Sequence, residues 1–144
     1  MNSYTQDEKK KRAMKRLAEL FHDHWEEGRV GSTRVFEHIV PDEWLICGQS
    51  TSGGKHREHV VPCVLIRDQS IAMYQRGRSI EDVAKMIEKH LAIVLISEKE
   101  REILDKAFGW KTIMPPGWEF ASGDPFARLT MAGIDVKLNN EVRL

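Results

Sequence analysis

The seven residues from His56 to Pro62, His-Arg-Glu-His-Val-Val-Pro, decide how the rest of the chain is interpreted. Their pattern predicts a strand from about position 56 to 61, which the proline interrupts. On an extended strand His56 and Glu58 share one face, whereas His59 lies on the other. A carboxylate and a neighbouring imidazole can take separate roles in hydrolysis. The carboxylate holds a divalent cation, and the imidazole activates water.

The chain after this strand alternates helices with a second strand. Residues 64–76 and 80–90 have helical patterns separated by Gly77, and Ser79 is a good N-cap for the second helix. The apolar run Leu91–Ile96 has the length of a buried strand. Ser97 then caps a predicted helix that continues to about Phe108 and stops at Gly109.

The chain before this strand begins with a long amphipathic helix. Thr5 and Glu8 form a capping-box pattern, the apolar residues recur at helical spacing, and glycines at 28 and 31 end the helix. Its first turns carry many lysines and arginines, which we interpret as a solvated face or, alternatively, a phosphate-facing or partner-facing patch. Two short strands are predicted at Thr33–Val40 and Glu43–Cys47. A loop from Gly48 to Gly54 follows.

The tail is expected to contain a turn at Gly123–Pro125, a short helix near 125–132 and a last strand near 134–138. Trp118 is expected to bury its ring against the body and to donate its indole N–H to the backbone. Short strands and helices alternate without regular βαβ units, so the predicted class is α+β. With 144 residues and no visible boundary, the chain is predicted to be one domain, 1–144.

Gly53-Gly54-Lys55-His56-Arg57-Glu58-His59-Val60-Val61-Pro62 resembles the first strand of HNH endonucleases, the ββα-metal or His-Me finger group. The resemblance implies a finger core over 45–110, with Leu91–Ile96 as its second strand and Ser97–Phe108 as its helix. The helical pair at 64–90 would then be an insertion, residues 1–28 an N-terminal helix and 111–144 a C-terminal extension. The resemblance also implies that His59 is the general base and Glu58 a metal ligand.

The chain departs from the family pattern at two points. The second-strand region contains no Asn to orient the catalytic histidine, and the helix contains no His to bind the metal. Arg101 aligns where related sequences often have His, and a guanidinium cannot bind a cation. Glu98 or Glu100 is therefore expected to complete a site for Mg²⁺ or a similar divalent cation. Lys55, Arg57 and Arg101 are expected to contact phosphate.

Two readings without a nuclease site remain open. In the first, Arg57 and Glu58 are ordinary charged residues of a strand, and His59 is half-buried and hydrogen-bonded. Alternatively, the cysteines at 47 and 63 bind zinc together with His56 and His59, which are ligands of the right kind. Without zinc, we expect the two cysteines to be buried free thiols.

The composition limits the possible partners. Lys plus Arg and Asp plus Glu both number 22, which argues against a protein that binds nucleic acid through bulk positive charge. Nothing resembles a signal peptide or a membrane span, and two cysteines do not make a disulfide framework, so a cytoplasmic protein is expected.

Two functions follow. The leading hypothesis is an HNH-like protein that binds DNA or RNA and hydrolyses phosphodiester bonds with a metal. The alternative is a catalytically degraded HNH-like interaction protein, such as a phage or mobile-element inhibitor of a host nucleoprotein defence complex of the anti-CRISPR kind.

Overall fold

Residues 3–139 are described by a computed structural model. The chain divides into two compact units, here called the helical unit and the sheet unit. The helical unit contains the chain up to Leu45 together with Cys63–His90, and the sheet unit contains Ile46–Pro62 together with the chain from Leu91. The mixed α+β class is confirmed. The single domain over 1–144 stays a prediction.

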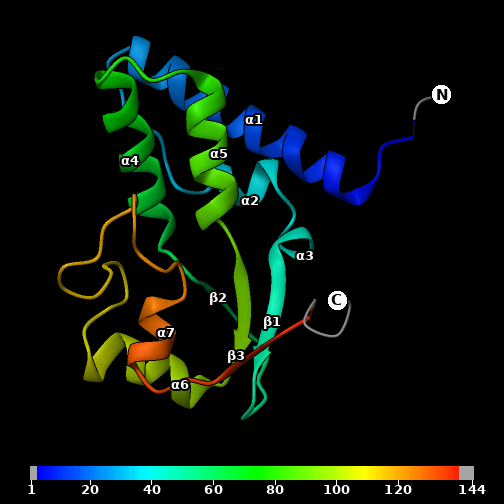
Figure 1. Cartoon of the computed structure of the whole chain (residues 1–144), viewed down its shortest axis with the longest axis vertical. Helices are drawn as coiled ribbons and strands as arrows, with labels where there is room; N and C mark the ends of the chain where they lie inside the picture. The colour runs from blue at the N-terminus through cyan, green and yellow to red at the C-terminus, as the bar shows by residue number, and fades with distance from the viewer. Residues whose placement is uncertain (1–2, 140–144) are drawn as a thin grey trace. The chain divides into compact units, whose positions relative to one another are not determined.

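The helical unit is built around α1 (Gln6–Glu26), which starts at the predicted capping box: Thr5 accepts from the Glu8 backbone, and Glu8 accepts from the Thr5 backbone. Helices α4 (Cys63–Gln75) and α5 (Ile80–His90) both pack against α1 (Figure 1). The Tyr74 hydroxyl of α4 donates to the Ala18 carbonyl of α1 at 2.6 Å. The helical pair predicted at 64–90 is confirmed, and it shares a core with the N-terminal helix.

The two strands predicted at Thr33–Val40 and Glu43–Cys47 are wrong. Helix α2 (Val35–Ile39) replaces the first, and α3 (Asp42–Leu45) replaces most of the second. The physical reason lies in tertiary packing. Phe36 and Val40 are buried four positions apart, the spacing of one helical turn, and Phe36 packs on Phe21 of α1 with ring centroids 5.5 Å apart. Local β-propensity is overridden by this burial.

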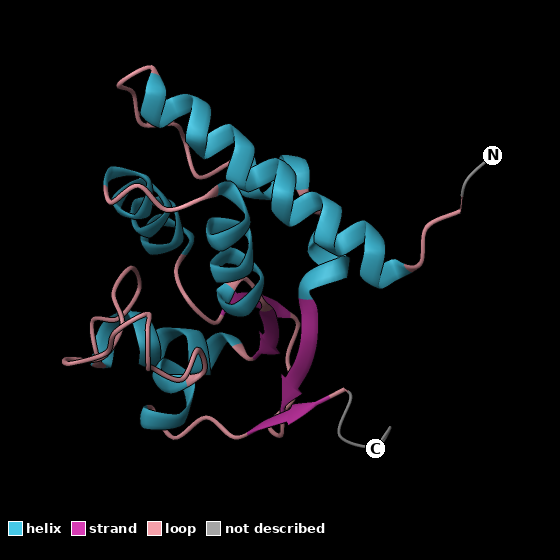
Figure 2. Cartoon of the chain, turned by 45° about the horizontal axis from the view of Figure 1, so that its top comes forward, coloured by secondary structure: helices cyan, strands magenta, loops and turns pink. Residues whose placement is uncertain are grey.

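Among residues 3–139 the sheet unit contains four strands in the order β2-β3-β1-β4. Figure 2 shows the strands in magenta. Strand β2 (His56–His59) pairs antiparallel with β3 (Ile93–Ile96), and β3 pairs parallel with β1 (Ile46–Ser50). Strand β4 (Val136–Leu138) pairs antiparallel with β1. Within the part of the chain that the structure describes, strand β2 therefore lies at the edge of this sheet, next to β3.

The loop predicted from Gly48 to Gly54 is wrong over its first half. Strand β1 continues to Ser50 because Gly48, Gln49 and Ser50 pair with β4. Gly48 suits this central position, since a Cβ there would press against the Lys137 carbonyl at 2.8 Å. The turn begins only at position 51, and β2 starts after Gly54.

The segment after β3 follows the prediction. Ser97 caps α6 (Glu98–Glu102), the chain continues as a π-helical turn, η1 (Ile103–Ala107), and Gly109 ends it with a φ of +69°. In the tail, α7 (Ala127–Met131) and β4 match the predicted helix and strand. The Trp118 indole donates to the Asp124 carbonyl at 2.8 Å, which confirms the predicted backbone bond.

Between residues 3 and 139, no helix combines the length and the apolar character that a membrane span requires. The free cysteines are half-buried, whereas the sequence predicted buried thiols.

Candidate functional site

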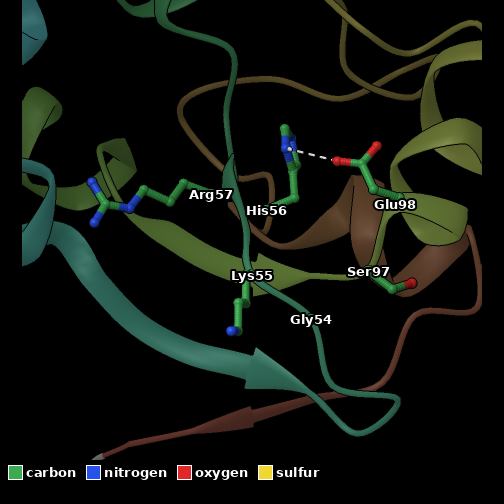
Figure 3. Close-up of a pocket in the computed structure, with 6 residues that line it drawn as sticks. All are labelled: Gly54, Lys55, His56, Arg57, Ser97 and Glu98. Atoms are coloured by element: carbon green, nitrogen blue, oxygen red, sulfur yellow. Dashed lines mark ion pairs between the residues drawn. The ribbon is translucent and has the colours of Figure 1, made fainter.

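A cleft of about 630 Å³ opens in the sheet unit where β2 begins and α6 begins. Its lining side chains and backbone come from Gly54, Lys55, His56, Arg57, Ser97 and Glu98. The antiparallel pairing of β2 with β3 places His56 opposite Ile96, one residue before the Ser97 cap. The strand pair thus brings two segments that are forty positions apart to one cleft (Figure 3).

The imidazole of His56 lies between two carboxylates. Its Nε2 is 3.1 Å from Glu58 Oε1, and its Nδ1 is 3.9 Å from Glu98 Oε1. Figure 3 shows His56 and Glu98 pointing toward one another across the cleft. The contact with Glu58 confirms that alternate residues of the strand share a face.

Glu58 is held by a buried arginine from α7. Arg128 is fully buried, and its Nη2 lies 2.9 Å from Glu58 Oε2. The same guanidinium donates to the carbonyls of Trp110 at 2.7 Å and Val60 at 3.4 Å, and also to the carbonyl of His59. A buried cation is tolerated only where its donors are satisfied, and here carbonyl oxygens and one carboxylate accept from it.

Glu100, one of the predicted metal ligands, performs a structural role. Its Oε1 accepts from the Ser97 backbone at 2.9 Å and from the Ser50 hydroxyl at 2.7 Å. Burial alone would raise the pKa of this carboxyl, but the hydrogen bonds from Ser97 and Ser50 outweigh it and hold the pKa below its ordinary value. Glu100 therefore fixes the start of α6 against β1.

Glu98, the other carboxylate predicted on this helix, lies in the cleft. Its side chain is 70% exposed, Oε1 faces His56, and Oε2 accepts from Arg101 Nε at 2.9 Å. Among the three carboxylates predicted to bind metal, Glu98 thus remains the most open to solvent, whereas Glu58 and Glu100 are 12% and 8% exposed.

His59, the predicted general base, does not line this cleft. It is the last residue of β2, pairs with Ile93 and is half-buried. The strand alternation turns its side chain away from the face that carries His56 and Glu58. The histidine that meets the carboxylates of the cleft is therefore His56.

The three predicted phosphate contacts are placed differently. Lys55 and Arg57 line the cleft and are exposed, and Figure 3 shows Arg57 extending from the side of β2 opposite His56. Arg101 does not line the cleft; it pairs with Glu98 at 2.9 Å and Asp105 at 3.3 Å on its own helix. Its hydrogen bond to Glu98 raises the pKa of Arg101.

Within residues 3–139, a single group of three or more potential metal-binding side chains has its ligand atoms within 4.8 Å of one another: His22, Asp23 and Glu26 of α1. These groups are largely exposed, and His22 pairs with Glu26 at 3.3 Å. Among the described residues neither cysteine belongs to such a group, and the four-residue zinc site stays a prediction.

The sequence did not predict the roles of two residues of the site. Strand alternation placed His56 beside Glu58, but the role of general base was given to His59. Arg128 gave no local signal, since nothing in the segment Gly123–Arg128 predicts that its guanidinium is buried under a strand 70 positions away. Compared with protein-family models, curated proteins and solved structures, the chain gives no match.

Proposed function

We propose that the protein binds nucleic acid at the cleft beside β2 and hydrolyses phosphodiester bonds there with the help of a divalent cation, as an HNH-like nuclease. The observation that carries the proposal is the His56 imidazole, held between Glu58 and Glu98 in a cleft that two cationic side chains also line. An oriented imidazole can accept a proton from an attacking water, and cationic groups beside it can stabilise the charge on the phosphate oxygens.

In this proposal His56 takes the role that the sequence assigned to His59. Glu58 orients the ring through Nε2, and Nδ1 faces the cleft as the proton acceptor for an attacking water. Lys55 and Arg57 bind backbone phosphates, which fixes the position of the nucleic acid without reading its bases.

The residues of the cleft fit a weakly held divalent cation through Glu98. Mg²⁺ commonly binds through one or two carboxylates together with substrate phosphates. Glu98 offers an exposed carboxylate in the cleft: Arg101 binds its Oε2, while its Oε1 lies 3.9 Å from His56 Nδ1. Glu58 and Glu100 fit poorly, because their oxygens already accept hydrogen bonds from Arg128, His56, Ser50 and Ser97. Bound there, a cation would stabilise the charge that develops on the phosphate oxygens.

The order of elements agrees with the resemblance in the sequence. Strand β2 pairs antiparallel with β3, and α6 follows β3 directly. This order of two antiparallel strands and a helix is compatible with a ββα finger, and it supports the HNH-like assignment as a proposal.

The test is cleavage of supercoiled plasmid DNA and of a structured RNA with Mg²⁺ or Mn²⁺, with EDTA as the metal-free control. His56→Ala is expected to reduce cleavage at least ~100-fold. His38→Ala, an exposed histidine of α2, is the matched control and should retain full activity. No cleavage of either substrate with either metal would overturn the hydrolytic function, and equal activity of wild type and His56→Ala would overturn the role of His56 as general base.

His59→Ala separates the two histidines. A loss of cleavage confined to His59→Ala would return the role of general base to His59. A loss confined to His56→Ala, with His59→Ala close to wild type, would support the assignment to His56.

One observation favours the non-catalytic alternative, an interaction protein of the phage or mobile-element inhibitor kind. Two of the three predicted metal carboxylates, Glu58 and Glu100, are engaged in internal hydrogen bonds. Copurification of the intact protein with a bacterial nucleoprotein defence complex, together with absent cleavage, would support this alternative. Metal-dependent cleavage that His56→Ala abolishes would exclude it.

A further inference from the structure

We infer that Arg128 and Glu58 are positioning residues that fix one tautomer of His56, with the proton on Nε2 and the lone pair of Nδ1 directed into the cleft. This inference extends the proposed function, and the role of the tautomer in catalysis rests on that function. It assigns to the buried Arg128 of α7 a role in the chemistry of a cleft that Arg128 itself does not line.

Arg128 supplies the positive charge of this network. A guanidinium stays protonated and donates only. Fully buried Arg128 lies 2.9 Å from Glu58 Oε2, and the two groups form an ion pair in which Glu58 is the carboxylate. An ionised carboxylate accepts hydrogen bonds and donates none.

The second oxygen of Glu58 determines which nitrogen of His56 carries the proton. Glu58 Oε1 lies 3.1 Å from His56 Nε2, and since this oxygen can only accept, the proton of that hydrogen bond belongs to Nε2. In a neutral imidazole one nitrogen donates and the other accepts. Nδ1 is therefore the accepting nitrogen of the neutral ring, and at 3.9 Å from Glu98 Oε1 it lies beyond hydrogen-bond distance of that carboxylate.

Arg128 also fixes where Glu58 sits along the strand. Besides Glu58, it binds the carbonyls of His59, Val60 and Trp110, so the carboxylate and the backbone that follows it share one anchor. The carboxylate then has one place to lie relative to His56. Because these contacts form only when the sheet unit folds, folding itself fixes the tautomer of His56.

The most informative variant is Glu58→Gln. Arg128 donates to the amide oxygen, which turns the amide NH₂ toward His56 Nε2. An NH₂ group cannot accept, so His56 must present a lone pair at Nε2 and carry its proton on Nδ1. The substitution is thus expected to invert the tautomer while it leaves the size of the side chain unchanged.

The experiment is a two-bond ¹H–¹⁵N correlation spectrum of the full chain with ¹⁵N-labelled histidine, at a pH where the imidazoles are neutral, with His56→Ala used for assignment. Wild type should show the Nε2–H form of His56, and Glu58→Gln should show mainly the Nδ1–H form. Glu102→Gln, an exposed glutamate of α6, is the isosteric control and should match wild type. Arg128→Lys retains the charge but loses the planar set of donors, so both tautomers should be populated.

An Nδ1–H form in the wild-type protein would overturn the inference, and so would an Nε2–H form that persists in Glu58→Gln and Arg128→Lys. The wild-type spectrum tests the inferred tautomer of His56 even if a variant does not fold. The proposed function is judged separately by cleavage, which Glu58→Gln should reduce about 10²- to 10⁴-fold. A tautomer that inverts in a protein without cleavage would keep the positioning network and reject the nuclease function.

Discussion

Arg128 Nη2 lies 2.9 Å from Glu58 Oε2, although 70 positions separate the two residues in the sequence. The pair joins α7 to the strand that carries His56, and it lies in the interior of the sheet unit, where Arg128 is fully buried and Glu58 is 12% exposed. The same contact therefore bears on both the stability of the sheet unit and the chemistry of the cleft.

Removing the arginine should destabilise the fold strongly. Arg128→Met leaves the Glu58 carboxylate and several carbonyls without their donor, and breaking a buried ion pair in this way costs about 3–5 kcal/mol of unfolding free energy. Urea denaturation measures it. The exposed Arg34→Met is the control and should change stability by no more than about 0.5 kcal/mol. A loss below 1 kcal/mol for Arg128→Met would contradict the network.

Gly54 is expected to tolerate no side chain. A Cβ at this position would collide with the backbone of Ile96 and Ser97, at the junction between β3 and α6. Its φ of +151° adds strain for any L-residue. Gly54→Ala should therefore lower the unfolding temperature and displace β2 from β3, which amide hydrogen exchange in β2 would detect as lost protection.

Gly53→Ala is the matched control for this prediction. Gly53 also has a positive φ, +77°, but a Cβ there meets nothing within 4 Å. It should cost only the conformational strain, about 1 kcal/mol. Similar losses for the two variants would show that backbone strain, and not the contact with Ile96 and Ser97, limits position 54.

Acid should destabilise the protein through Glu100. The hydrogen bonds of the folded state lower the pKa of this carboxyl, so its contribution to stability is present above the ordinary glutamate pKa and is lost as the pH falls through the lowered value. Unfolding free energy measured between pH 7 and pH 3 should fall less steeply for Glu100→Gln than for wild type. Parallel pH profiles would contradict the role of the ionised carboxylate.

Alkali should destabilise the protein through Cys63. Burial, with the nearby carboxylates of Asp42 and Glu37, raises the pKa of the Cys63 thiol to about 12. The folded state therefore resists ionisation that the unfolded chain undergoes near pH 9, and stability should decline from about pH 9 upward. Cys63→Ala should flatten this decline.

The same thiol should react slowly, because the thiolate is the nucleophile. At pH 8, alkylation of Cys63 by iodoacetamide in the folded protein is expected to be about 1000-fold slower than in the urea-unfolded chain. Mass spectrometry of the modified peptide follows the rate. Alkylation in the folded protein at the unfolded rate would contradict the raised pKa.

The local sequence predicted most helices and strands because their signals are contained within a few residues. Thr5 with Glu8 and Ser97 with Glu100 both form the capping boxes that start α1 and α6. The segments 33–40 and 43–47 were predicted as strands and are helical, because their conformation depends on what Phe36 and Val40 pack against.

By itself, the sequence determined the α+β class, the helix caps, and the sharing of one strand face by His56 and Glu58, since each depends on the geometry of neighbouring residues. Only the tertiary structure decided which carboxylates remain open to the cleft. Glu100 is bound by Ser50, 50 positions away, and Glu58 by Arg128, 70 positions away. Contacts of this kind form when distant segments pack in the sheet unit, and no local pattern of residues encodes them.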